Sequence, residues 1–159
     1  MIRFIAVIDS KQGLADDNGI PWQGLLPTDI AFFRSKSIHG NLMMGYGWYV
    51  EQKKPLPERK NLVATTKTEP LRPGFEAVHD ARAYLQNAKE DIWVGGGALL
   101  FASTLDLANV LYITQLKDQD WHCTKFFPPY KDKFQMVSES EPITESGITY
   151  TFQVWKPKK

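Results

Sequence analysis

The sequence has little cysteine, no excess of charge of either sign and no long apolar run. Cys123 is the only cysteine among 159 residues, which excludes an internal disulfide and fits a reducing compartment. Lysine and arginine number 19 against 18 aspartate and glutamate residues. This balance gives no net electrostatic field that would attract nucleic acid or an anionic membrane. No apolar run approaches the roughly 20 residues of a membrane span, and the N-terminus lacks a secretory signal. We expect a cytoplasmic protein.

Metal ligands are also scarce. His39 and His79 stand alone, and His122 adjoins Cys123, so on an extended strand those two side chains would point to opposite faces. No metal site is predicted. The hydrophobic fraction of 43% and the charged fraction of 23% are typical of a soluble globular chain of one domain. No sustained heptad demands a partner, so a monomer is expected.

Short β-rich runs alternate with helix-like segments over the first two thirds of the chain. Strands are predicted at 2–8, 41–45, 60–65, 75–78, 91–97 and 110–116, helices at about 27–37, 47–53, 80–88 and 97–104, and a long polar loop at 9–24. Two alternating runs beyond Pro129 predict an antiparallel hairpin. The prediction is one α/β domain over 1–159: a mostly parallel central sheet of about eight strands, helices on both faces and an antiparallel C-terminal edge hairpin.

A single charge stands in an apolar stretch, "IPWQGLLPTDIAFF" (20–33). If a helix begins near Pro27, Asp29 shares part of one face with Phe32 and Phe33. Asp29 is therefore a candidate ligand-binding carboxylate. The alternative is that it only satisfies backbone N–H groups and the dipole at the helix start.

Three glycines separate a predicted strand from a helix in "VGGGALLFA" (94–102). A nucleotide pyrophosphate can approach bare backbone there and lie at a helix start. Close strand-to-helix packing without a ligand is the alternative. The run "TTK" ends another strand, and Thr65, Thr66 and Lys67 can hold a ribose phosphate, although exposed lysines are usually only solvated.

Six segments together resemble one family across nearly the whole chain: "DNGIPWQGLLPTDIAFF", "MMG", "PLPERKNLVATT", "VGGG", "LYIT" and "CTKFFP". In this order and spacing they resemble dihydrofolate reductase. The resemblance implies an NADPH-dependent oxidoreductase of one-carbon metabolism. It would transfer hydride to C6 of 7,8-dihydrofolate, with protonation at N5, to give 5,6,7,8-tetrahydrofolate.

The resemblance also implies roles for individual residues. Asp29 would accept two N–H bonds from the pterin, and burial would raise its pKa so that it helps to direct a proton. Thr114 would hydrogen-bond Asp29, Trp22 would hold an ordered water, and Arg59 would pair with the α-carboxylate of the substrate's glutamate tail. Ordinary core or surface roles are the alternatives for these three. The expected pocket wall is Ile5, Ala6, Ile30, Phe33, Leu56 and Val94.

The cofactor side is expected on a mobile loop, Ala15 to Trp22, and on the glycine turn, which in this family includes a cis peptide. The expected NADPH contacts are Val7, Leu14, Ala15, Ile20, Gly45, Trp48, Thr65, Thr66, Lys67, Gly95, Gly96, Gly97, Ala98, Leu99 and Thr124.

The departures from the family pattern lie on this cofactor side. Tyr46 replaces an arginine that normally contacts the 2′-phosphate, and Trp48 replaces a threonine at the pyrophosphate. Ala98 and Leu100 also depart from the usual residues. Lys67 can supply the missing charge, and Arg72 lies in the following loop. We predict NADPH, with reduced discrimination against NADH.

Two rival functions remain open. The reductase domain of riboflavin synthesis would need phosphate-binding groups in the substrate cleft, whereas the apolar pocket and Arg59 favour a pteroylglutamate. A noncatalytic nucleotide- or folate-binding protein is the other rival.

Overall fold

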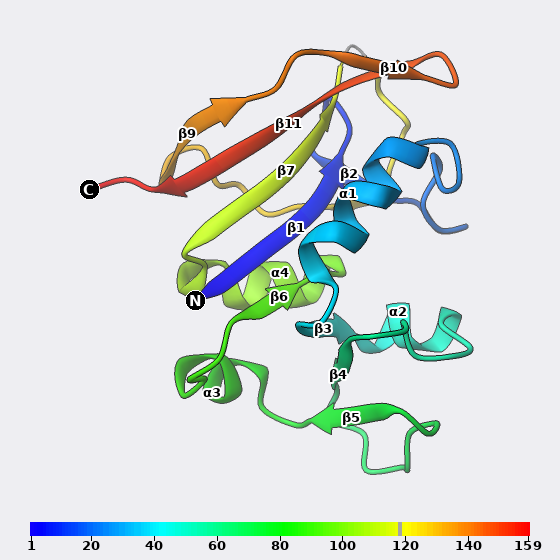
Figure 1. Cartoon of the computed structure of the whole chain (residues 1–159), viewed down its shortest axis with the longest axis vertical. Helices are drawn as coiled ribbons and strands as arrows, with labels where there is room; N and C mark the ends of the chain where they lie inside the picture. Colours follow the sequence, from blue (N-terminus) through cyan, green and yellow to red (C-terminus); the bar gives the residue numbers. More distant parts are fainter. Residues whose placement is uncertain (118) are drawn as a thin grey trace.

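One twisted sheet organises the molecule (Figure 1). A computed structural model describes residues 1–117 and 119–159. The sheet has nine strands in the order β10-β11-β7-β1-β6-β3-β4-β5, with β9 also paired to β11. These strands are β1 (Ile2–Ile8), β3 (Asn41–Gly45), β4 (Lys60–Ala64), β5 (Phe75–Val78), β6 (Ile92–Val94), β7 (Val110–Leu116), β9 (Phe134–Glu139), β10 (Ile143–Glu145) and β11 (Ile148–Pro157). The helices are α1 (Pro27–Ser37), α2 (Tyr46–Glu51), α3 (Ala81–Gln86), α4 (Ala98–Thr104) and the short 3₁₀ helix η1 (Leu105–Leu107).

The structure confirms the predicted α/β fold with a mostly parallel sheet. All pairings among β1, β3, β4, β5, β6 and β7 are parallel, and β11 pairs antiparallel with β7. The helix at 27–37 and four of the six predicted strands have the predicted bounds, whereas the strand expected at 91–97 is only Ile92–Val94. Of the helices in the described residues, none has both the length and the apolar character needed to cross a membrane.

The C-terminal edge contains one more strand than the predicted hairpin. β10 joins β11 through Ser146 and Gly147, whose φ angles of 53° and 74° are both positive. Two such residues match a tight turn of the primed type, whose twist suits antiparallel strands. β9 pairs farther along β11. Because β11 has ten residues and β9 only six, its outer edge has room for both partners.

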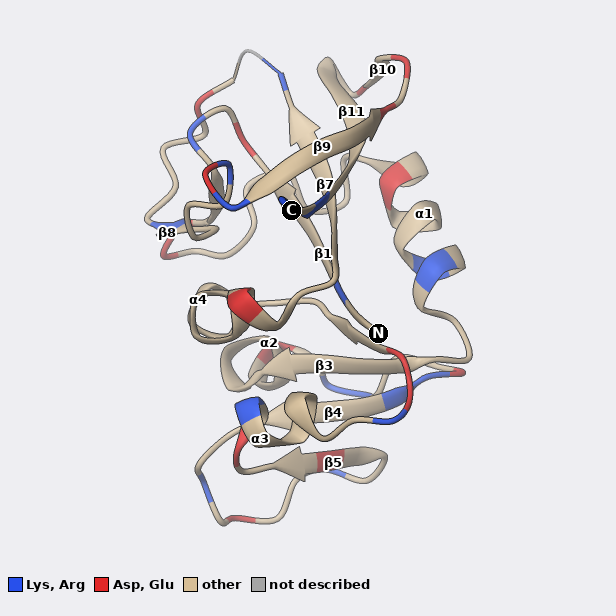
Figure 2. Ribbon diagram, turned by 90° about the vertical axis from the view of Figure 1, so that its left-hand side faces the viewer, with Lys and Arg blue, Asp and Glu red and all other residues tan. Residues whose placement is uncertain are grey.

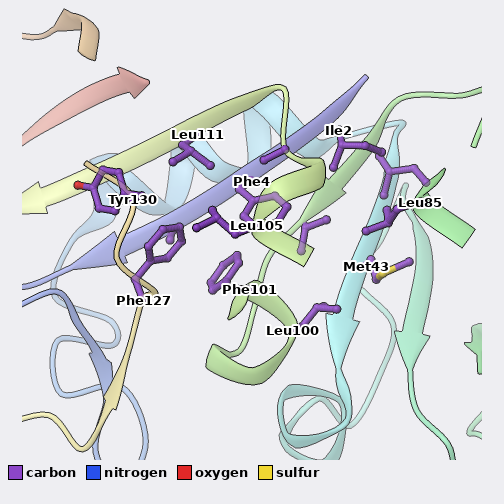
Figure 3. Packing of buried hydrophobic residues seen from close by; sticks show 14 of the residues in the cluster. Ile2, Phe4, Met43, Leu85, Leu100, Phe101, Leu105, Leu111, Phe127 and Tyr130 are labelled. Carbon is purple, nitrogen blue, oxygen red and sulfur yellow. The ribbon is translucent and has the colours of Figure 1, made fainter. Parts of the chain in front are cut away.

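Side chains alternate between the two faces of β1, and helices cover both faces as predicted. Phe4, Ala6 and Ile8 join the α4-side core, a cluster with Phe101 of α4. Figure 3 shows Phe4 and Phe101 packed together beside Leu111 and Phe127. Ile5 joins the α1-side core, which includes Leu42, Met44, Tyr49, Val63 and Trp93. Figure 2 shows α1 and α4 on opposite sides of β1 and β7.

The segment predicted as a long polar loop, 9–24, is only partly irregular. Its β2 (Gly13–Ala15) pairs antiparallel with β8 (Lys125–Phe126) in a small second sheet. Asp9 is fully buried, and its carboxylate accepts backbone N–H groups from Lys11, Gly13 and Trp121 at 2.9, 2.7 and 2.9 Å. One carboxylate thus ties the start of this segment to the segment that follows β7.

We predict that Asp9→Ala lowers the free energy of unfolding by about 2–4 kcal/mol, because buried backbone N–H groups lose their acceptor. Urea denaturation measures the change. The control is Asp132→Ala at an exposed turn position, for which a change below about 0.5 kcal/mol is expected. Equal, small effects of the two substitutions would contradict this role of Asp9.

Candidate active site

A carboxylate on α1 and a hydroxyl on β7 form the centre of the site. Asp29 lies in the first turn of α1, and Thr114 is buried on β7. Thr114 Oγ1 donates to Asp29 Oδ1 at 2.7 Å, so the hydrogen bond implied by the family resemblance is present. Phe32 of α1 also packs on Tyr112 of β7, with 6.4 Å between their ring centroids. The hydrogen bond holds one carboxylate oxygen on the sheet side.

The surroundings of Asp29 disfavour its charged form. Burial is the largest cause and raises the pKa of Asp29 from 3.8 to about 6. The hydrogen bond from Thr114 acts in the opposite direction, and the nearby carboxylate of Glu145 adds to the rise. Asp29 is therefore a carboxyl group that exchanges its proton close to neutral pH, as general acids often do.

A backbone N–H group at the start of α1 is hydrogen-bonded by a residue other than Asp29. The N-cap position holds Leu26, which provides no side-chain cap. Glu145, from β10, instead accepts the backbone N–H of Thr28 at 3.1 Å. Since Asp29 bonds across to β7, the helix-capping alternative does not describe its main contact.

Apart from Ile30, the predicted wall residues divide between the two cores of the sheet. Ile5 lies in the α1-side core, and Phe33 and Leu56 pack against that core. Ile30 is 54% exposed, so its side chain is open to contact from solvent. Ala6 and Val94 are different, because their side chains belong to the α4-side core.

The side chains of Ala6 and Val94 therefore lie away from the α1-side core, and their predicted contact with substrate stays a prediction. Successive residues of a strand point to opposite faces, and the neighbour of Ala6, Ile5, is the one on the α1 side. Val94 is fully buried. Any ligand contact at these two positions has to come from their backbone.

Arg59 is held at the far end of α1 by several contacts. Its Nε donates to the buried Ser37 Oγ at 2.8 Å, and its guanidinium lies 5.6 Å from the ring centre of Phe33. Asn61 braces the same loop through bonds with the backbone of Leu56 and Arg59. Burial, and then the charge of the neighbouring Arg34, lower the pKa of Arg59. A guanidinium fixed in this way is suited to a carboxylate ligand.

The segment around Trp22 packs against the loop after β7. Trp22 is 5% exposed, and its ring meets Trp121 edge-on at 6.0 Å between centroids. Thr124 donates its backbone N–H to Ala15 O at 2.9 Å and its hydroxyl to Asp17 Oδ1 at 2.9 Å. The predicted cofactor residues Ala15 and Thr124 are thus brought together. Ile20 is 46% exposed.

The glycine turn lies beside the end of β3. Gly95 N–H donates to Met43 O at 3.0 Å, and Gly45 N–H donates to Gly96 O at 2.7 Å. The Gly96–Gly97 peptide is cis, and Gly96 has φ 108°. A Cβ at Gly45 would lie 3.3 Å from Gly97 N, so the backbones approach closely. This bare, convergent backbone fits a nucleotide pyrophosphate. Ala98 and Leu99 follow, and Leu99 is 88% exposed.

The end of β4 adds polar groups next to this turn. Ala64 pairs with Gly45, so Thr65, Thr66 and Lys67 begin directly beside it. The Lys67 ammonium lies 5.0 Å from the ring centre of Tyr46, in the range of a cation–π contact. Tyr46, which stands where an arginine was expected, therefore contacts Lys67, a residue that can provide the positive charge of that arginine.

Two other cofactor-side residues are already engaged within the protein. Arg72 bonds to the backbone oxygens of Tyr49 and Gln52 at the end of α2, and it stacks 4.0 Å from the Tyr49 ring centre. It is thus committed to α2 rather than free to bind a phosphate. Trp48 packs so closely on Gly95 that a Cβ there would lie 2.5 Å from its ring. Its bulk fills space beside the turn.

The family model described as dihydrofolate reductase matches residues 1–157. The chain belongs to the dihydrofolate reductase family. Relatives bearing that family name are those of Buchnera aphidicola, 36% identical over 82% of this chain and 80% of that protein, and Staphylococcus aureus strain MSSA476, 30% identical over 95% and 94%. The Bacillus subtilis relative is 27% identical over 96% and 91%.

A solved structure supports the dihydrofolate reductase fold. The enzyme from Enterococcus faecalis, in complex with NADP(H) and RAB-propyl, matches with a TM-score of 0.87 and 23% identity, over 100% of this chain and 97% of that one. The family resemblance inferred from the sequence segments is confirmed by the family match.

Three residues near the site were not foreseen from the sequence. Ser37 and Asn61 support Arg59, and Glu145 lies beside the start of α1. Ser37 and Asn61 give no local signal. The apolar Leu26 at the helix N-cap was an available signal for Glu145, since an uncapped helix start requires acceptors from elsewhere.

We predict that Asp29→Asn stabilises the protein at neutral pH. The folded-state pKa of about 6 exceeds 3.8, so the stability linked to this group is complete below pH 3.8 and is lost as the pH rises through about 6. Asparagine does not ionise. The unfolding free energy of the variant should exceed that of wild type by about 1–3 kcal/mol at about pH 8, with a much smaller difference at about pH 4. Urea denaturation at both pH values checks this; an equal difference at both would contradict it.

Proposed function

We propose that the protein is an NADPH-dependent dihydrofolate reductase that converts 7,8-dihydrofolate to 5,6,7,8-tetrahydrofolate in the cytoplasm, as a monomer. The observation that carries the proposal is the Asp29–Thr114 pair, a partly buried carboxylate in the first turn of a helix whose Phe32 and Phe33 pack against an apolar core. The single cysteine supports the reducing compartment.

Asp29 recognises the pterin. Its carboxylate accepts two parallel N–H bonds from the 2-amino-4-oxo edge, as it would from a guanidinium. Thr114 donates to Oδ1 and so fixes the rotation of the carboxylate. Ile5, Phe33 and Leu56 pack on the two ring faces, where they exclude water and strengthen these polar contacts.

Asp29 also binds and releases the proton that the reaction needs. With a pKa of about 6, it binds a proton near neutral pH and releases it with little cost, which suits delivery toward N5. Trp22, packed on Trp121, positions the ordered water that carries this proton. Turnover should therefore fall as the pH rises through about 6.

NADPH supplies the hydride that reaches C6. Gly45, Gly96 and Gly97 form the bare backbone that receives its pyrophosphate, and Lys67 with Thr65 and Thr66 holds the ribose phosphate. Arg59 pairs with the glutamate tail of the substrate. The segment from Ala15 to Trp22, attached through β2 and Thr124, closes over the nicotinamide.

The decisive measurement is the loss of NADPH absorbance on addition of dihydrofolate. Activity that requires a ribosylamino-pyrimidine phosphate instead would favour the riboflavin-synthesis rival, and binding without turnover would favour a noncatalytic protein. Either outcome would overturn the proposal.

We predict that Asp29→Asn retains the fold and loses most turnover at neutral pH, since the amide cannot accept both pterin N–H groups or transfer a proton. The loss should be about 100-fold or more in kcat/KM. Circular dichroism checks the fold. A folded variant with near wild-type turnover would exclude the role of Asp29.

We predict that Lys67→Gln lowers kcat/KM for NADPH by about tenfold, because one charged phosphate contact contributes about 1.5 kcal/mol or more. The value for NADH should change by less than about twofold, which leaves little discrimination between the cofactors. The matched control is Lys131→Gln, because Lys131 also lies over a tyrosine ring, that of Tyr130, at 5.9 Å. A clear wild-type preference for NADH would defeat the NADPH assignment.

A further inference from the structure

The first turn of α1 is attached to the C-terminal edge of the sheet. Glu145 at the end of β10 accepts the backbone N–H of Thr28 with Oε1 at 3.1 Å and the Thr28 hydroxyl with Oε2. These two residues are separated by 117 positions in sequence. A third bond runs from Ser146 Oγ to Leu25 O at 2.8 Å. The β10–β11 turn therefore contacts the chain on both sides of Leu26, the uncapped helix N-cap.

The Glu145 carboxylate is fixed by the sheet as well. Tyr150 is fully buried on β11, and its hydroxyl donates to Glu145 Oε1 at 2.5 Å. Hydrogen bonds from Thr28 and Tyr150 lower the pKa of Glu145. Burial, and then the hydrogen bond to Glu145, raise the pKa of Tyr150. In the pH range where Asp29 titrates, Glu145 is therefore charged, and the Tyr150 phenol that donates to it is neutral.

Asp29 follows Thr28 directly, so the contacts of Thr28 set where its side chain begins. Thr114 reaches Asp29 from β7, Glu145 approaches from β10, and Tyr150 from β11. Of these, Glu145 alone carries a charge at neutral pH, since threonine does not ionise and Tyr150 stays protonated.

We propose that Glu145 is a positioning residue for Asp29: it fixes the start of α1 on the sheet through Thr28 and sets the electrostatic surroundings of the substrate-binding carboxyl. The effect of Glu145 on turnover rests on the proposed function, whereas the effect of Glu145 on the titration of Asp29 does not. Removing the charge should favour ionised Asp29 at lower pH, because like charges disfavour each other. A structural cap alone would have no such effect.

Three variants separate the charge from the cap. Glu145→Gln keeps one oxygen, which can accept the Thr28 backbone N–H and the Tyr150 hydroxyl, places an NH₂ that can donate to the Thr28 hydroxyl oxygen, and removes the charge. Thr28→Val removes the hydroxyl donor and leaves the charge. Glu141→Gln is the matched control, since it makes the same change at an exposed position of the preceding connection. Each is measured by carboxyl ¹³C NMR titration of Asp29, without ligands, and by the pH profile of NADPH oxidation with dihydrofolate.

We expect the Asp29 titration midpoint of Glu145→Gln to move down by about half a pH unit, with an equal shift in the upper limb of the rate profile. That shift corresponds to about a threefold loss of rate well above the midpoint. Thr28→Val should raise the KM for dihydrofolate and leave the midpoint in place. Glu141→Gln should match wild type in both measurements.

An unmoved Asp29 midpoint in Glu145→Gln, or the same shift in Glu141→Gln, would overturn the inference. A wild-type protein without dihydrofolate-dependent oxidation, but with the expected NMR shift in Glu145→Gln, would overturn the proposed function and support the inference. The two failures are therefore distinguishable.

Discussion

The hydrogen bond from Thr114 to Asp29 is the constraint on which the site depends. It links residues 85 positions apart, and it requires α1 to lie along β7 with its first turn at the level of Thr114. A carboxylate held there is partly removed from water, which raises its pKa to about 6. The same burial makes the ionised form of the group unfavourable for folding. The site therefore opposes stability at neutral pH, and apolar packing on both faces of the sheet has to offset that cost.

The parallel sheet explains why the other groups gather near this bond. β3, β4 and β6 lie side by side and end at one edge, so the residues after each strand meet there. The glycines at 45, 95 and 96 are needed for different reasons. Gly45 and Gly95 have close neighbours where a Cβ would be, and Gly96 has a positive φ. The close backbone approach at Gly45 and the polar groups after β4 thus arise from the same set of strand ends.

Local patterns in the sequence were sufficient to predict β1 and α1, which position the first part of the site. The apolar run at 2–8 and the proline start at 27 predicted β1 and α1 with the observed bounds. Contacts between distant segments were not predictable in this way. β2 has three residues and exists because β8 pairs with it, and β10 was not foreseen because β9 alone satisfied the expected hairpin. Strand alternation places the side chains of Ala6 and Val94 in the α4-side core. The family resemblance assigned both residues to the pocket by sequence position alone, which does not say on which face of the sheet a side chain lies.

On the expected cofactor side, a lysine from a neighbouring strand end lies beside Tyr46. Tyr46 begins α2 directly after β3, and Lys67 follows the end of β4. The ring of Tyr46 lies 5.0 Å from the Lys67 ammonium, so it limits the conformations of a side chain that would otherwise lose much entropy on binding a phosphate. Arg72 cannot serve in the same way, because the last turn of α2 already uses its guanidinium. The adjacent pairing of Gly45 with Ala64 thus places the Lys67 charge beside position 46, one strand end away from the arginine expected there.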